Sequence, residues 1–236
     1  MQEKPVEHLA IEIKAVYPHD PVAFTQGLVW DGGVLYESTG LYGRSSLRRV
    51  EPVSGEVMEI RSVDPNLFGE GLARVGDRLL QLTWHAGITL VYDLATLDLV
   101  DEYGFNGEGW GLAYDGERLA MSDGSHRVTF RDQEDFRWLA TLEVKLEGKP
   151  VNYLNELEFA EGSLYANVWG EDRIVRIDPD TGRVTAVIDA SDLLSPAEKS
   201  RVDVLNGIAY DPVSKTFWLT GKFWPKMFQV VFVPAA

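Results

Sequence analysis

The feature that most constrains the fold of this chain is a short phrase that recurs about every 45 residues. Each copy places one polar or aromatic residue ahead of a glycine or glutamate, which is followed by Leu or Ile. The copies are residues 24–28 (FTQGL), 68–72 (FGEGL), 109–112 (GWGL), 154–157 (LNEL) and 205–208 (LNGI). Counted at the residue before Leu or Ile, they lie 44, 40, 45 and 51 residues apart. This period predicts the four-stranded blades of a β-propeller, with one copy per blade.

The segments between the copies have the pattern of short antiparallel strands. Four apolar runs of the third unit, separated by turns rich in Gly and Asp, occupy residues 112–114, 118–121, 126–130 and 137–142. The last unit, residues 206–233, has room for only three strands. An alternating segment, residues 9–16, precedes the first copy and belongs to no complete unit. This segment is the natural candidate for the missing strand.

We therefore predict an all-β fold, a five-bladed β-propeller of four-stranded antiparallel blades. The N-terminal strand closes the last blade, and residues 1–236 form a single propeller domain, which suits the length of the chain. A β-sandwich is the alternative, but a sandwich does not explain a phrase repeated at this period. Residues 195–202 are the one segment with helical character, and we expect a short capped helix there.

Strand polarity predicts which of the unusual side chains meet. The phrase begins the innermost strand of each blade, and the turn between the second and third strands lies at the same end, because neighbouring strands are antiparallel. The other end carries ordinary turns, such as residues 115–116 and 161–162. We expect one mouth of the central channel to collect seven side chains, namely Gln26, Glu70, Trp84, Trp110, Asn155, Trp169 and Lys222.

Composition argues against several function classes. The chain has 37 Asp+Glu against 22 Lys+Arg, a formal charge of −15, so neither nucleic acid nor an anionic membrane is an expected partner. It has no cysteine, and hence no disulfide, thiolate metal site or cysteine nucleophile. No apolar run approaches the roughly 18 residues of a membrane span, and the polar first residues contain no visible signal peptide. The four histidines lie at positions 8, 19, 85 and 126, without the spacing of metal ligands.

The ordered set of phrases resembles the plant-type glutaminyl cyclases, the glutamine cyclotransferase family, which also occurs in bacteria. The likeness runs from about residue 17 to the end of the chain without a missing unit. The matching phrases are residues 17–20 (YPHD), 23–28 (AFTQGL), 68–71 (FGEG), 82–84 (LTW), 108–112 (EGWGL), 154–157 (LNEL), 166–169 (ANVW), 205–210 (LNGIAY) and 219–222 (LTGK).

This resemblance implies a five-bladed propeller that converts the N-terminal glutaminyl residue of a peptide or protein to pyroglutamate and releases ammonia. It implies an acyltransferase that works without zinc or another cofactor. The family likeness also favours a periplasmic or secreted protein, with a leader that these residues do not include. We expect a monomer.

The chemistry of cyclisation assigns roles to two charged residues. The α-amine attacks the side-chain amide carbon, and the amide nitrogen leaves only after protonation, so a carboxyl group that takes the first proton and passes it on serves both steps. We predict that Glu70 is this shuttle, and the resemblance places the family's catalytic glutamate there. Lys222 is predicted to stabilise the developing oxyanion or to tune Glu70. The alternative for Glu70 is a structural role in a turn or an ion pair. The alternative for Lys222 is an ordinary solvated surface lysine.

The remaining candidates are predicted to bind substrate. Trp84, Trp110 and Trp169 would form pocket walls and present indole N–H donors, whereas ordinary blade packing is the alternative. Gln26 and Asn155 would hold the amine or amide of the substrate, or else would be buried turn residues. Glu156 is interpreted as a structural hydrogen-bonding residue. Packing is the expected role of five further aromatics, Phe24, Tyr42, Phe68, Phe223 and Trp224.

Two other function classes stay open on the residues alone. A metal-dependent lactonase-like propeller would bind a hard cation at its axis, and its ligands would come in part from Glu70, Asn155, Glu156 and Asn206. A non-catalytic propeller would bind a peptide at the same mouth, since a fold does not by itself imply an enzyme.

Overall fold

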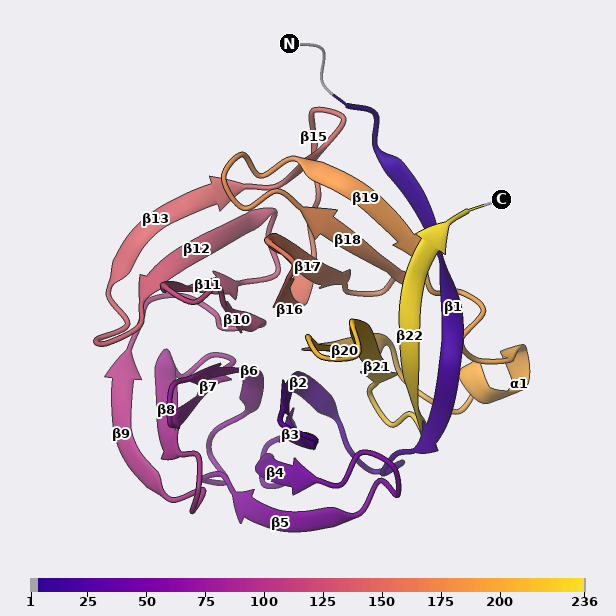
Figure 1. The fold of residues 1–236 in the computed structure, drawn as a ribbon. Helices are drawn as coiled ribbons and strands as arrows, with labels where there is room; N and C mark the ends of the chain where they lie inside the picture. Colours follow the sequence, from indigo (N-terminus) through magenta and orange to yellow (C-terminus); the bar gives the residue numbers. More distant parts are fainter. Residues whose placement is uncertain (1–3, 236) are drawn as a thin grey trace.

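The computed structural model describes residues 4–235, which form 22 β-strands and one short helix arranged as a ring (Figure 1). The first three groups along the ring are separate four-stranded antiparallel sheets. The first contains β2 (Thr25–Asp31), β3 (Val34–Thr39), β4 (Ser46–Val50) and β5 (Val57–Ser62). The second contains β6 (Gly69–Val75), β7 (Arg78–Thr83), β8 (Ile88–Asp93) and β9 (Leu99–Gly104). The third contains β10 (Leu112–Tyr114), β11 (Arg118–Ser122), β12 (Arg127–Asp132) and β13 (Trp138–Glu143).

The rest of the ring is one eight-stranded sheet made of two groups of four. One group contains β16 (Leu154–Ala160), β17 (Ser163–Val168), β18 (Arg173–Ile177) and β19 (Val184–Asp189). The other contains β20 (Leu205–Asp211), β21 (Thr216–Gly221), β22 (Lys226–Pro234) and β1 (Glu7–Pro18). The groups join where β1 pairs in parallel with β19, while β1 pairs antiparallel with β22. The predicted closure by the N-terminal strand is therefore confirmed, with a strand longer than residues 9–16.

The innermost strands explain why the repeated phrase has its form. Figure 1 shows β2, β6, β10, β16 and β20 around the central axis, each beginning with one copy of the phrase. A Cβ atom added at Gly27 would lie 2.4 Å from the backbone nitrogen of Leu72, and one at Gly111 would lie 2.0 Å from the Asn155 carbonyl oxygen. Neighbouring inner strands therefore approach too closely for a side chain there. The Leu or Ile that follows is at most 1% exposed in every copy, at positions 28, 72, 112, 157 and 208.

The end of β1 is fastened to the last group by a buried histidine. The His19 backbone N–H donates to the Pro225 carbonyl at 3.0 Å, and His19 Nδ1 lies 2.6 Å from the Trp224 carbonyl oxygen. His19 Nε2 lies 2.9 Å from a carboxylate oxygen of Glu37, and both side chains are at most 2% exposed. This ion pair joins the start of the chain to both the first and the last groups.

Two smaller elements lie outside the blades. The helix α1 (Pro196–Lys199) begins at the N-cap residue Ser195, whose side chain forms a capping box with Glu198, so the expected helix is present but shorter than residues 195–202. A hairpin of β14 (Lys145–Leu146) and β15 (Lys149–Pro150) was not expected, because two-residue strands leave no periodic pattern. No helix within residues 4–235 has the length and apolar character needed to cross a membrane.

Candidate active site

One cavity of about 450 Å³ contains all seven side chains predicted to converge. It lies where the inner strands begin, at the end of the axis that strand polarity predicted. Its complete lining is Phe24, Gln26, Leu41, Phe68, Glu70, Trp84, Trp110, Asn155, Trp169 and Lys222. Leu41 was not expected here, and Phe24 and Phe68 were expected only to pack. Phe24 and Phe68 do pack edge to face, at 6.0 Å between ring centroids, but they line the cavity as well.

β-Bulges direct the polar members of the phrase into the cavity. The register of β6 with β7 shifts between Gly69 and Leu72, so Glu70 lies in a bulge. Equivalent shifts occur between residues 25 and 27, 154 and 157, and 205 and 208. A bulge places an extra residue on one strand and reorients its side chain. Gln26, Glu70 and Asn155, which lie in three of these bulges, line the cavity.

Glu70 is a buried carboxyl group with one side-chain hydrogen bond. It is 4% exposed, and Gln26 Nε2 donates to its Oε1 at 2.8 Å. Burial raises the pKa of the Glu70 carboxyl well above its usual range, although the positive charge of Lys222 opposes this and the negative charge of Glu108 adds to it. A carboxyl group with a raised pKa is able to hold a proton near neutral pH and to release it again.

Gln26 has its amide engaged by protein groups. Asn206 Nδ2 donates to Gln26 Oε1 at 3.2 Å and to the Thr25 carbonyl oxygen at 3.0 Å. Since the Gln26 oxygen is held in this way, its amide nitrogen faces Glu70. Gln26 thus contacts the Glu70 carboxyl group in this structure, and its role in holding the substrate amine or amide stays a prediction.

Lys222 is a buried ammonium group that also lines the cavity. It is 5% exposed, and its Nζ lies 4.8 Å from the centroid of the Phe24 ring, a cation–π distance. Burial lowers the pKa of Lys222, while the charges of Glu70 and Asp203 oppose that shift. Its backbone N–H donates to the Val204 carbonyl at 3.0 Å, which anchors the turn that carries it.

The indoles lie as predicted, but two of their N–H groups are already bonded. Trp84 Nε1 and Trp110 Nε1 donate to the same oxygen, Glu108 Oε2, at 2.8 and 2.9 Å. The expectation that these two indoles offer free donors is therefore wrong, and their contribution to the cavity is the ring surface. Trp169 meets Trp110 edge to face at 6.4 Å and is 44% exposed. Glu108 appeared in the sequence analysis only as part of the matching phrase at residues 108–112, and nothing in the sequence assigned it a contact.

Asn155 lines the cavity, and its side-chain oxygen is buried and unpaired. Its side chain is 2% exposed, and among residues 4–235 its Oδ1 has no hydrogen-bond partner. Its backbone carbonyl accepts from Ser122 Oγ at 2.7 Å, which holds the residue in place. An unpaired buried acceptor is costly, and this oxygen has less than 1 Å² of accessible surface even though the residue lines the cavity.

Glu156 is buried outside the cavity wall. One carboxylate oxygen accepts from the Ile208 backbone N–H at 2.8 Å and the other from the Leu28 backbone N–H at 3.3 Å. The residue is fully buried, and burial together with the nearby Glu158 raises its pKa well above the usual range. It ties three inner strands together, as the structural interpretation predicted.

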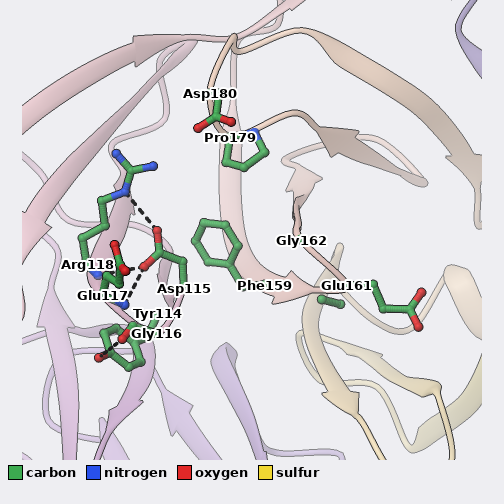
Figure 2. Close-up of a pocket in the computed structure, with 11 residues that line it drawn as sticks. Tyr114, Asp115, Gly116, Glu117, Arg118, Phe159, Glu161, Gly162, Pro179 and Asp180 are labelled. Carbon is green, nitrogen blue, oxygen red and sulfur yellow. Dashed lines mark hydrogen bonds and ion pairs between the residues drawn. The ribbon is translucent and has the colours of Figure 1, made fainter.

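The opposite end of the propeller has a different character. A cavity of about 660 Å³ there lies between turns of the third and fourth groups (Figure 2). Its polar groups bond to one another, since the Tyr114 hydroxyl donates to the Gly116 carbonyl and Asp115 accepts from the Arg118 guanidinium.

Within the described part of the chain, no group of three or more His, Asp or Glu side chains is arranged to hold a metal ion.

Comparisons with known proteins agree with one another. A family model described as "Glutamine cyclotransferase" matches residues 1–232. The glutaminyl-peptide cyclotransferase of Arabidopsis thaliana is 42% identical over 225 residues, covering 93% of this chain and 70% of the plant protein. The crystal structure of Myxococcus xanthus glutaminyl cyclase matches with a TM-score of 0.91 and 39% identity, over 99% of this chain and 100% of that one. Kuenenia stuttgartiensis hydrazine synthase, at 17% identity and a TM-score of 0.53 over 93% of this chain and 65% of that one, shares the fold alone.

Proposed function

We infer the function from the premise that the chain belongs to the glutamine cyclotransferase family. On that premise the protein is a glutaminyl-peptide cyclotransferase, an acyltransferase that acts on peptides or proteins with N-terminal Gln. We propose that it forms pyroglutamate and releases ammonia by intramolecular aminolysis without a metal ion, and that Glu70 is the proton shuttle.

The cavity offers a place for the glutamine side chain between aromatic walls. The ring faces of Trp84, Trp110 and Trp169 would exclude water from the reacting atoms, which strengthens every polar interaction inside. The Asn155 side chain, which lines the cavity, would hold the amine or amide of the substrate. These contacts hold the flexible side chain in the bent conformation that ring closure requires.

Ring closure then proceeds through one proton carried by Glu70. The neutral α-amine attacks the side-chain amide carbon, forming the new C–N bond, and the Glu70 carboxylate takes the proton released from the amine. Lys222 stabilises the negative charge that develops on the amide oxygen. The protonated Glu70 passes its proton to the departing nitrogen, the old C–N bond breaks, and ammonia leaves.

The observation that carries this mechanism is the Glu70 carboxyl group, which is 4% exposed, bonded to Gln26, and placed in a cavity wall with a buried ammonium. A carboxyl group in this setting can both accept and donate a proton near neutral pH.

The test is ammonia release from a dipeptide that begins with Gln, before and after exhaustive chelation. We expect release that chelation leaves unchanged. Absence of ammonia would favour a non-catalytic peptide-binding propeller. Activity lost on chelation and restored by a divalent cation would contradict metal independence.

We also propose that the protein is a monomer of a single domain that acts in the periplasm or outside the cell. A single cooperative thermal transition and a monomeric mass in light scattering are the expected results. Recovery of the activity with a cytoplasmic marker enzyme would contradict the location.

A further inference from the structure

Glu108 joins two walls of the cavity through one oxygen atom. Its Oε2 accepts from Trp84 Nε1 at 2.8 Å and from Trp110 Nε1 at 2.9 Å. Trp84 follows β7, whereas Trp110 directly precedes the innermost strand of the next group, β10. One carboxylate oxygen therefore connects indoles from neighbouring groups at the mouth.

We propose that Glu108 is a positioning residue of the cyclase, which holds the Trp84 and Trp110 indoles in a fixed relative orientation and so keeps the glutamine cavity preformed. This inference rests on the proposed function. Hydrogen bonds to a carboxylate are stronger than those between neutral groups, and two of them converging on one atom restrict both rings.

The surroundings of the two rings show why such a restraint matters. The backbone of both residues is fixed, since the Trp84 N–H donates to the Phe68 carbonyl and the Trp110 N–H to the Ser122 carbonyl, each at 3.0 Å. The rings themselves extend toward the open mouth. Trp84 stacks on the half-exposed His85 at 3.8 Å. Phe68 meets the Trp84 ring edge to face at 5.4 Å, and the hydrogen bond to Glu108 adds a directional restraint to these ring contacts.

The charge of Glu108 also reaches Glu70. The indole N–H of Trp110, and then that of Trp84, lower the pKa of Glu108, so it remains a carboxylate at neutral pH even though it is partly shielded from water. Its negative charge raises the pKa of Glu70. The other titratable groups that face this pair are His85, whose Nδ1 lies 3.6 Å from Glu108 Oε1, and Lys222, whose charge acts on Glu70. Glu108 therefore has two effects that can be separated by experiment: it holds the two indoles in place, and its charge raises the pKa of Glu70.

Two substitutions separate them. Glu108→Gln keeps an acceptor oxygen for the indoles but removes the charge, whereas Glu108→Ala removes both. For Glu108→Ala we expect kcat/KM to fall by about tenfold to a hundredfold, mainly through a higher KM, because the walls no longer stand ready for the substrate. For Glu108→Gln we expect kcat/KM within about threefold at the pH optimum, with the acid limb of its pH profile moved to lower pH.

The indoles themselves give an independent readout. The chain has 7 Trp residues, and their indole N–H resonances are countable in a proton–nitrogen correlation spectrum. Glu108→Ala should shift two of them strongly, and Glu108→Gln should leave both close to their wild-type positions. Glu117→Ala, at an exposed turn on the opposite end, removes the same charge and should change neither the spectrum nor kcat/KM.

The outcomes distinguish this inference from the proposed function. Wild-type protein that releases no ammonia overturns both. If the wild type is active, two results would overturn the positioning role alone. One is a Glu108→Ala variant as active as the wild type, and the other is unmoved indole resonances in that variant. Equal losses in Glu108→Gln and Glu108→Ala would also overturn it, because the charge and not the acceptor would then be what matters.

A second inference comes from an exposed aromatic beside the mouth. Tyr153 has a positive φ of 64°, which is uncommon for a residue other than glycine, and its side chain is 53% exposed. Its N–H donates to the Gly124 carbonyl, and its carbonyl accepts from the Trp169 N–H, both at 2.8 Å. The Tyr153 ring lies 5.8 Å from that of Trp169 and borders a further cavity of about 430 Å³. The backbone is thus held in a strained conformation that displays the ring to solvent.

We infer that Tyr153 and Trp169 form a subsite for the side chain that follows the N-terminal glutamine, with a preference for an aromatic residue there. This inference also rests on the proposed function. Trp169 lines the glutamine cavity, and its contact with Tyr153 continues that apolar wall outward, which is the direction in which a peptide must leave the site. Aromatic pairs at such distances favour offset or edge-on contact with a third ring.

The test compares Gln-Phe and Gln-Gly dipeptides. We expect wild type to favour Gln-Phe in kcat/KM by about threefold to tenfold, and Tyr153→Ala to lose that preference while its turnover of Gln-Gly stays within twofold. Trp138→Ala, which removes an aromatic 61% exposed on an outer strand, should keep the preference. Equal losses on both peptides in Tyr153→Ala would overturn the subsite, and no ammonia from wild type would overturn the cyclase assignment as well.

Discussion

Two buried glutamates, Glu70 and Glu156, lie at adjacent positions of the repeated phrase and differ in what surrounds them. Each lies in a bulge at the start of an inner strand, and burial raises the pKa of both. The oxygens of Glu156 accept backbone N–H groups from two other inner strands, whereas Glu70 has one amide partner and faces a cavity. Burial and a raised pKa are therefore shared by a structural and a candidate catalytic carboxyl. The two glutamates differ in their access to the cavity and in the groups that donate hydrogen bonds to them.

The largest expected contrast is in activity. Glu70→Gln keeps the shape of the side chain and an acceptor for Gln26 but removes the exchangeable proton, so we expect kcat to fall by about 10² to 10⁴. Its thermal midpoint should not fall, because a buried ionisable group has been replaced by a neutral one of equal size. Ammonia release and a thermal scan on the same preparation measure both. Undiminished turnover would remove Glu70 from the mechanism.

Lys222 comes next. Lys222→Met keeps an unbranched chain over the Phe24 ring but removes the charge, and we expect kcat to fall by about 10² to 10³, as for the loss of an oxyanion donor. Since the charge of Lys222 lowers the pKa of Glu70, its removal should raise that pKa and move the acid limb of the kcat/KM profile to higher pH. A pH profile for wild type and variant checks the sign. A marked loss of stability with normal turnover would make Lys222 a structural residue.

Glu156 should show the reverse pattern. Glu156→Gln replaces one of its two acceptor oxygens by an N–H donor, which leaves one backbone N–H of β2 or β20 unpaired. We expect the free energy of unfolding to fall by about 1 to 3 kcal/mol, with kcat per folded molecule near that of wild type. Denaturant titration and active-site normalised kinetics test this. A loss of turnover as large as that of Glu70→Gln would erase the distinction between the two glutamates.

The smallest effect is the pH dependence of stability. The folded-state pKa of Glu156 lies above its unfolded value, so its contribution to stability is fully present below the unfolded pKa and is lost as pH rises toward the folded one. The free energy of unfolding of wild type relative to Glu156→Gln should therefore decline with rising pH, by at most about 1.4 kcal/mol per pH unit. Parallel curves for the two proteins would mean that Glu156 ionises normally in the fold.

The repeat made much of this architecture predictable. Its period indicated the blades, and strand polarity alone brought residues as distant as Gln26 and Lys222 to one cavity. The hydrogen bonds inside the cavity were beyond such reasoning. That Gln26 faces Glu70 depends on Asn206 from the last group, and the contact of Glu108 with two indoles depends on rotamers that sequence does not specify. The repeated phrase predicts where the inner strands begin. The hydrogen bonds between side chains of different blades depend on how those side chains pack, which the phrase does not predict.

The most direct measurement is the pH dependence of kcat/KM for wild type and Glu70→Gln with one Gln-initiated dipeptide. The account predicts a wild-type acid limb well above the usual range of a glutamate pKa, because turnover needs the Glu70 carboxylate and burial raises its pKa. The residual activity of Glu70→Gln should lack the Glu70 ionisation and should keep only the limb that protonation of the substrate α-amine causes in both proteins, at a pKa of about 8. Identical pH profiles for the two proteins would contradict the role of Glu70, since no enzyme ionisation would then depend on it.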